Sequence, residues 1–125
     1  MIKIEQLENG WRLKNGNMTL DISRMTGCLS ALTVNAAKVF EWTRHEGDVV
    51  VRDDRMERSF GHKHLRKVNV ESKGDELRIE KIFKDAPWRL LETYHVEDDT
   101  VRWEAQLVLE KGEYRSCEIS YHIPW

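Results

Sequence analysis

The residues with the most evident chemistry form the segment His62-Lys63-His64. On a β-strand, residues i and i+2 point to the same side, so both imidazoles could reach one metal ion or one substrate. A metal site also needs a third ligand, and spacing selects none of the nearby donors, which are His45, Glu46, Asp53 and Asp54. The ordinary interpretation is a polar surface loop. We predict no metal site, and keep His62 and His64 as candidate ligand-binding residues.

Paired acids are a second chemical pattern, because glycosidases use two carboxylates. The pairs are Asp53-Asp54, Asp75-Glu76 and Asp98-Asp99. Adjacent acids on a strand point to opposite faces, and in a turn they bind backbone or water. Since Asp98-Asp99 lies where a hairpin turn is required, we interpret it as turn chemistry. No phosphate loop, nucleophile elbow or Cys-x-x-Cys motif is present, so we predict no catalytic residue and no cofactor.

Five tryptophans are many for 125 residues. A buried tryptophan supplies core area, whereas an exposed one can stack on a flat ligand such as a sugar ring. Trp103 is in phase with Val101 and Leu107, which predicts a core position. Trp42 and Trp88 lie at predicted strand ends beside charged residues. They are therefore the better candidates for ligand contact.

These residues must be positioned by strands, because the apolar pattern has a period of two nearly throughout. Turn signals such as Lys73-Gly74-Asp75 and Lys111-Gly112 separate the alternating runs. Short connections force antiparallel neighbours. The second half is therefore predicted to be a five-strand meander, over residues 65–73, 76–84, 88–97, 100–110 and 113–123.

The first half is also strand-like. Asn15-Gly16 predicts a tight turn between strands over 11–13 and 17–22, and further strands are expected over 28–34, 39–42 and 48–51. Residues 53–64 are polar and predicted to be a long loop, and helix formers around Ala36 allow one helical turn. The chain is thus expected to be all-β, an antiparallel β-sandwich rich in meander connections, with about nine to eleven strands.

Composition narrows the functional classes. The 125 residues suffice for one domain, and 40% hydrophobic residues are enough for a packed core. A net charge of −2 without a basic block argues against nucleic-acid binding. The sequence contains no apolar run of about 18 residues, so we predict no membrane-spanning segment. No signal peptide is visible, which favours the cytoplasm. Cys28 and Cys117 are expected to be free thiols, although a disulfide between distant strands is an alternative.

The last four residues, His122 to Trp125, follow an amphipathic strand without a polar tail. A tryptophan is a poor residue to leave exposed. We therefore expect residues 1–125 to be a single β-sandwich domain that is a fragment of a longer chain.

Two segments resemble a known family. One runs from Glu8-Asn9-Gly10-Trp11 through Thr26-Gly27-Cys28-Leu29-Ser30-Ala31-Leu32, and the other is Glu92-Thr93-Tyr94-His95-Val96-Glu97-Asp98-Asp99-Thr100. Both are similar to paired strands of galactose-mutarotase-like β-sandwich domains, which precede the catalytic barrel in many glycoside hydrolases. The closing Tyr121-His122-Ile123-Pro124 is similar to a strand of those domains.

The resemblance implies a non-catalytic N-terminal domain that supports the catalytic domain of the same polypeptide. By that interpretation the parent protein is a glycoside hydrolase, and the isolated domain has an apolar face that favours homo-oligomers. Two alternatives stay open. A free-standing carbohydrate-binding module requires two coplanar exposed aromatic residues. A small mutarotase-type sugar epimerase requires a histidine and a carboxylate that converge in one cleft.

Overall fold

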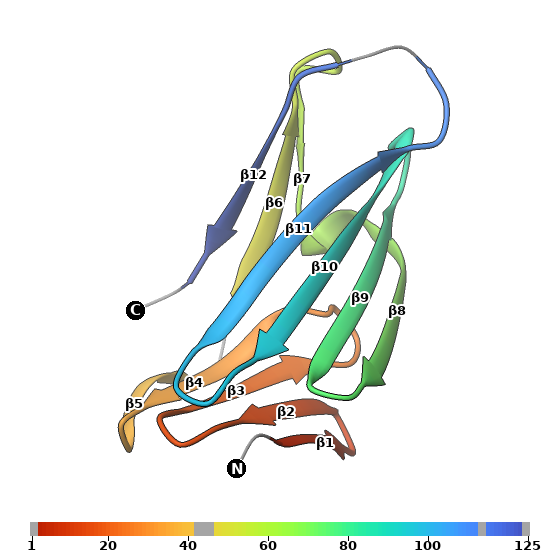
Figure 1. The fold of residues 1–125 in the computed structure, drawn as a ribbon. Coiled ribbons are helices and arrows are strands. Elements are labelled where there is room, and N and C mark those ends of the chain that lie inside the picture. Colours follow the sequence, from red (N-terminus) through yellow and green to blue (C-terminus); the bar gives the residue numbers. More distant parts are fainter. Residues whose placement is uncertain (1–2, 42–46, 113–114, 124–125) are drawn as a thin grey trace.

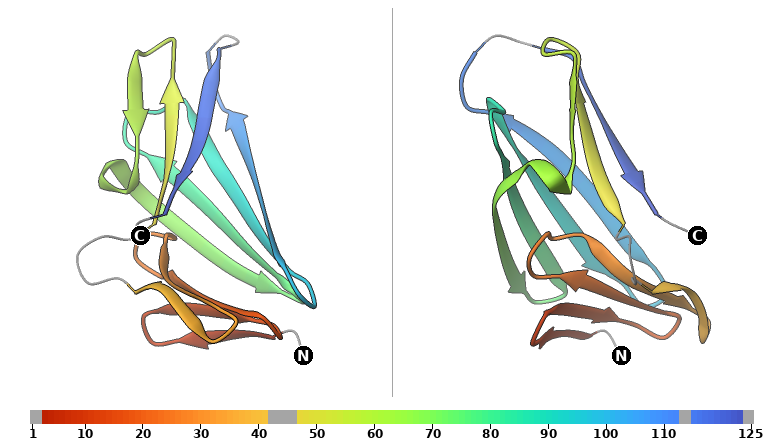
Figure 2. Two further views of the ribbon diagram at one scale, coloured as in Figure 1. Left: turned by 90° about the vertical axis from the view of Figure 1, so that its left-hand side faces the viewer. Right: turned by 180° about the vertical axis from the view of Figure 1, so that it is seen from behind.

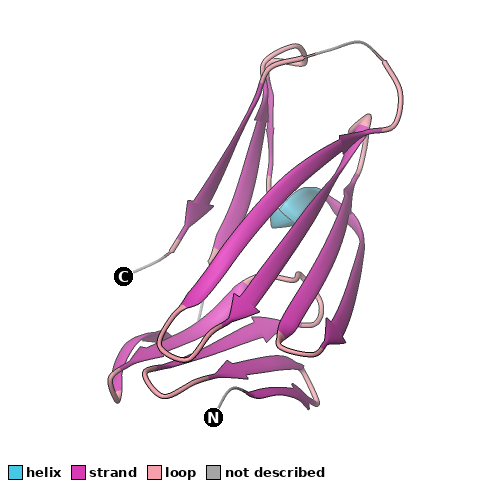
Figure 3. Ribbon diagram, in the orientation of Figure 1, coloured by secondary structure: helices cyan, strands magenta, loops and turns pink. Residues whose placement is uncertain are grey.

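The computed structural model describes residues 3–41, 47–112 and 115–123. These residues form twelve strands and one short 3-10 helix, η1 (Figure 3). Their bounds are β1 Lys3–Leu7, β2 Gly10–Lys14, β3 Met18–Ser23, β4 Leu29–Val34, β5 Ala37–Glu41, β6 Asp48–Asp53, β7 Arg58–Phe60, η1 His62–His64, β8 Leu65–Lys73, β9 Glu76–Phe83, β10 Trp88–Val96, β11 Val101–Leu109 and β12 Cys117–His122. The predicted all-β antiparallel fold is confirmed.

Three antiparallel sheets make up the sandwich (Figure 1). The N-terminal sheet has the order β1-β2-β3-β4-β5, the long sheet β11-β10-β9-β8, and the small sheet β12-β6-β7. One face of the long sheet is covered by the N-terminal sheet at one end and by the small sheet at the other, as the two views of Figure 2 show. The second layer of the sandwich is therefore divided between two sheets.

The long sheet follows the predicted period of two. In β10 every second residue from Trp88 to Val96 is buried, and the residues between them are only partly buried. The two ends of this face lie in two cores. Leu77, Ile79 and Tyr94 pack with the N-terminal sheet, whereas Phe83 and Leu90 pack with the small sheet. Strands β9 and β10 therefore join the two cores.

Hydrogen bonds of the Asn15 side chain join the N-terminal sheet to the long sheet. Its Oδ1 accepts hydrogen bonds from the backbone N–H groups of Asn17 (2.9 Å) and Met18 (2.8 Å). Its Nδ2 donates to the carbonyls of Glu97 (2.8 Å) and Thr100 (3.0 Å), in the β10–β11 turn. The side chain thus uses its full bonding capacity. The turn predicted at Asn15-Gly16 is confirmed, and so is the one at Asp98-Asp99.

The predicted fifth meander strand is wrong. β12 pairs with β6 in the small sheet, in a register that places Ile119 opposite Val51. The physical reason is that the chain after Gly112 is held to the end of β6. The Arg115 guanidinium donates to Asp53, and the Asp54 N–H donates to the Ser116 carbonyl. The chain therefore crosses to the other layer instead of turning back along β11.

Two further local predictions are wrong, and so is the strand count. Residues 53–64 contain β7 and η1, because the Phe60 side chain is fully buried and holds this segment against the core. No helical turn forms near Ala36. Asn35 and Ala36 instead adopt positive φ values of 51° and 64° in the β4–β5 hairpin. The expected nine to eleven strands become twelve among the described residues.

Candidate functional site

The two candidate histidines do not act as a pair. They lie on η1, not on a strand, so the predicted common orientation is wrong. His64 Nδ1 accepts a hydrogen bond from the Gly61 N–H at 3.0 Å. His62 Nδ1 lies 2.8 Å from Asp48 Oδ2, and a carboxylate only accepts, so this nitrogen carries the proton. The rings therefore use the same nitrogen for opposite hydrogen-bonding roles.

Asp48 and His62 instead form a dyad. Asp48 begins β6, and its Oδ1 also accepts the His62 backbone N–H at 3.1 Å. A Cβ on Gly61 would lie 2.8 Å from Asp48 Oδ2, so a larger residue there would force the Asp48 carboxylate to shift. His62 keeps 35% of its side chain exposed. With Nδ1–H bound to the carboxylate, a neutral ring presents the lone pair of Nε2, as a general base must.

A buried polar chain lies between the layers. Lys81 Nζ is 2.6 Å from Glu92 Oε2, and the two side chains are 1% and 0% exposed. Trp103 Nε1 donates to Glu92 Oε1 at 3.0 Å, and Cys28 Sγ lies 3.8 Å from Lys81 Nζ. Burial, the largest single effect, would lower the pKa of Lys81, but the charge and hydrogen bond of Glu92 together with the nearby Cys28 and Asp48 outweigh it and raise the pKa. Burial raises the pKa of Cys28 to about 11, so its thiol is protonated at neutral pH.

Sequence periodicity could have identified this buried group of polar side chains. Lys81 is in phase with the apolar Ile79 and Phe83, and Glu92 is in phase with Leu90 and Tyr94. Two opposite charges on the inner faces of neighbouring strands predict a buried ion pair.

Trp88 is not an exposed platform, so that prediction is wrong. Its side chain is 2% exposed and packs at 5.2 Å from Phe60 and 5.5 Å from Phe83, measured between ring centroids. Trp88 Nε1 donates to Asp53 Oδ2 at 2.8 Å. A tryptophan at a strand end is buried here because a carboxylate from β6 satisfies its only donor.

Asp53 was missed as an organising residue. It is fully buried and accepts from Trp88, Arg115 and the backbone N–H groups of Arg55 and Met56. Burial alone would raise the pKa of Asp53, but these hydrogen bonds outweigh it and hold the pKa below 3.8. The carboxylate is therefore ionised and fixes the positions of both Trp88 and Arg115.

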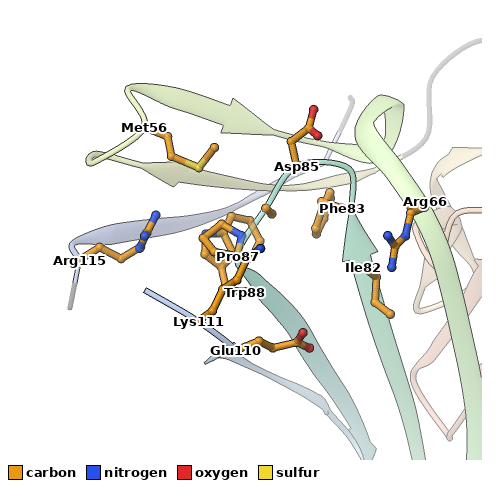
Figure 4. Close-up of a pocket in the computed structure, with 11 residues that line it drawn as sticks. Met56, Arg66, Ile82, Phe83, Asp85, Pro87, Trp88, Glu110, Lys111 and Arg115 are labelled. Atoms are coloured by element: carbon orange, nitrogen blue, oxygen red, sulfur yellow. The ribbon is translucent and has the colours of Figure 1, made fainter. Parts of the chain in front are cut away.

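A cavity of about 770 Å³ opens beside this group (Figure 4). It lies where the β9–β10 turn meets the β6–β7 hairpin and the end of β11. Trp88 and Pro87 lie in the middle of the lining, with Arg115 on one side and Arg66 on the other. A smaller cavity of about 290 Å³ shares Trp88 and Arg115, and is otherwise lined by Leu107, Leu109 and Cys117.

The small cavity lies at one end of the boundary between β11 and β12, where the core-facing residues of both strands are only partly covered. We call this boundary the open seam, and define it by the core-facing residues of these two edge strands, which are Trp103, Ala105, Leu107, Leu109, Cys117, Ile119 and Tyr121. None of them reaches full burial, and Leu109 is 41% exposed. Core-facing residues of the neighbouring inner strands β6 and β10 are buried throughout.

Other expectations concern single residues. Trp42 lies outside the described residues. Trp103 is half-buried and packs against both cores, with its ring 4.9 Å from that of Tyr121. Cys28 and Cys117 are free thiols, as predicted.

The described ranges, residues 3–41, 47–112 and 115–123, contain neither a metal-ligand cluster nor a membrane-spanning helix. No group of three His, Cys, Asp or Glu side chains there could hold a metal ion. No helix in the same ranges has the length and apolar character to cross a membrane.

Comparisons with known proteins do not assign the chain to a family. No family model matches it, and neither a curated protein nor a solved structure does.

Proposed function

We propose that this chain is a non-catalytic β-sandwich domain of a carbohydrate-active enzyme of the glycoside hydrolase kind. In this proposal the domain packs against a catalytic domain of the same polypeptide and supports its cleft. The observation that carries the proposal is the open seam. The residue resemblance to galactose-mutarotase-like domains supports the enzyme class.

The physical argument rests on the difference between edge and inner strands. The core-facing residues of β10 are buried, whereas Trp103, Leu107 and Ile119 face the same interior and remain half-exposed. The outer backbone edges of β11 and β12 have no ladder partner among the described strands. Apolar side chains beside an unpaired strand edge form a surface that another protein element can cover.

The first test is to sequence the coding DNA past the codon for Trp125. The proposal expects an open reading frame that continues into a catalytic domain, and a stop codon would overturn it. In the full polypeptide, hydrogen exchange of β11 and β12 should be slower than in the 125-residue chain. Equal exchange rates would also contradict the proposal.

A matched pair of variants locates the contact. Leu109→Lys places a charge in the open seam, whereas Val108→Lys places it on the outer face of the same strand. We expect only the first to weaken association between the separately purified domains, by about tenfold or more. Equal effects would place the contact elsewhere.

The Asp48–His62 dyad favours a second candidate function, a mutarotase-type sugar epimerase. In anomer interconversion the anomeric hydroxyl loses its proton as the ring C–O bond breaks, and the ring oxygen takes up a proton. His62 Nε2 can accept the first proton when Asp48 orients the imidazole, and water can supply the second. Exchange of glucose and galactose anomers can be followed by NMR. Catalysis lost in both His62→Ala and Asp48→Asn, with the fold retained, would support this function over the accessory role. Rates equal to those of buffer would exclude it.

The third alternative, a carbohydrate-binding module, loses one of its two proposed platform residues. Trp88 is buried against Phe60 and Phe83, so its face cannot stack on a sugar. Trp42 lies outside the described residues.

A further inference from the structure

The larger cavity beside Trp88 contains an arginine with an unused donor. Arg115 is 11% exposed, and its Nη1 donates to Asp53 Oδ2 at 2.8 Å. Its Nε is buried and has no hydrogen-bond partner within the described residues. A guanidinium stays charged at all ordinary pH values, and a buried N–H without an acceptor is destabilising. Asp53 therefore orients Arg115 but leaves part of its donor capacity unused, and because the Nε–H itself is buried, a ligand in the cavity reaches it only when the side chain shifts.

Asp53 does not leave Arg115 free to move away. Asp53 accepts from the Trp88 indole and from two backbone N–H groups as well as from Arg115. These bonds hold the carboxylate rigidly in the core, and the arginine with it. A donor fixed in advance loses little entropy when it binds an anion. This places a preorganised cation on the wall of the cavity.

The other charges around the cavity favour an anion. Arg66 and Lys111 also line it, and neither makes an ion pair within the part of the chain that the structure describes. The two acids of the lining already have partners. Asp85 lies 3.8 Å from an Arg58 nitrogen, and Glu110 lies 3.1 Å from Arg89 Nε. The unpaired cations, Arg66 and Lys111, therefore make the electrostatic potential of the cavity positive.

We propose that this cavity, of about 770 Å³, binds a small molecule through an oxyanion group, with Arg115 as the main donor and Lys111 and Arg66 as supporting charges. The shared chemistry is that of a carboxylate, as in a uronic acid, or of a sulfate or phosphate group. Pro87 and Met56 supply apolar surface for the rest of the ligand. This inference stands independently of the proposed function, because it uses neither the open seam nor the dyad.

The test is an NMR titration of the 125-residue chain, in which the Nε–Hε signal of Arg115 reports directly on the unused donor. The probes are glucuronate, inorganic phosphate and inorganic sulfate, with glucose as the uncharged control. We expect a saturable shift of this signal with at least one anion and none with glucose. A stronger response to glucuronate identifies a carboxylate ligand, and a stronger response to phosphate or sulfate identifies a tetrahedral one.

Variants make the result decisive. Arg115→Met should weaken binding by about tenfold or more, and its amide spectrum will show whether the fold survives. Lys111→Met, at an exposed site, should weaken it by about two- to fivefold. Arg102→Met, on the outer face at the far end of the long sheet, is the matched control and should have no effect. No saturable shift with any anion, or equal affinity in the Lys111 and Arg102 variants, would overturn the proposal.

Discussion

Lys81 and Glu92 form an ion pair in which both side chains are almost fully buried. Each is the main neutralising partner of the other. Removal of one partner from a buried ion pair leaves an uncompensated charge. The pair therefore couples β9 to β10 through electrostatics as well as through the backbone ladder.

Lys81→Met should lower the free energy of unfolding by about 3–5 kcal/mol, because Glu92 loses its cation. The double variant Lys81→Met, Glu92→Gln should recover much of that loss, since the amide oxygen still accepts from Trp103. Urea denaturation measures both. Arg12→Met is the control, because its ion pair with Asp21 is partly exposed and should contribute only about 0–1 kcal/mol. Simple additivity of the two buried substitutions would contradict the coupling.

Asp53 should contribute a pH-dependent stability. Its pKa is held below 3.8 in the folded chain, so its contribution is complete above that pH and is lost as the pH falls through the folded value. Asp53→Asn should cost about 1–3 kcal/mol at neutral pH. The difference from wild type should then shrink below about pH 4. Urea denaturation across pH tests this, with the exposed Asp54→Asn as a control that shows little change.

At the scale of elements, the β4–β5 hairpin has an unfavourable residue at its turn. Ala36 has a φ of +64°, a left-handed conformation in which a Cβ is strained. Asn35 before it tolerates this region better. The hairpin forms in spite of the local preference of Ala36, because β4 packs on the core through Leu29 and Leu32 and β5 pairs with β4.

Ala36→Gly should therefore raise the free energy of unfolding by about 1 kcal/mol, seen as a higher thermal midpoint. Ala37→Gly is the matched control. Ala37 begins β5. Glycine at this position makes the unfolded chain more flexible and relieves no strain, so it should lower the free energy of unfolding by about 0.5–1 kcal/mol. The same sign for both substitutions would refute the argument from backbone strain.

A second prediction at this scale concerns Asn15, which joins the N-terminal sheet to the β10–β11 turn. Asn15→Asp replaces the amide donor with a carboxylate oxygen that faces the carbonyls of Glu97 and Thr100. We expect a loss of at least about 2 kcal/mol in urea denaturation. Asn17→Asp at the neighbouring exposed position should cost far less, because Asn17 makes one long bond of 3.3 Å to Asp99.

For the whole molecule, the two cores should unfold together, since β9 and β10 contribute buried residues to both. Ile22→Val at the N-terminal sheet and Val51→Ala at the small sheet should each shift the unfolding curves of both cores equally. Residue-resolved NMR in urea measures the two ends separately. Separate midpoints for the two ends would show that the long sheet does not couple the cores.

Sequence pattern alone determined the fold class, the four strands of the long sheet and the position of most turns, because period-two alternation and turn residues are local signals. The structure adds register shifts where the strand predicted over 28–34 pairs with β3 and β5, which depend on the neighbouring strands. The tertiary structure decided everything that depends on distant partners. β12 joined β6 because Asp53 holds Arg115, and Trp88 became buried because Asp53 satisfies its indole.

The candidate site follows the same division. His62 was visible as a chemical group, but its partner Asp48 and the Arg115 cavity were not, because residues far apart in the chain meet there only after the two layers pack. The number of charges was fixed in the composition. Which of them became buried, paired or free was decided by packing, since desolvation and hydrogen bonding depend on the neighbours that the fold supplies.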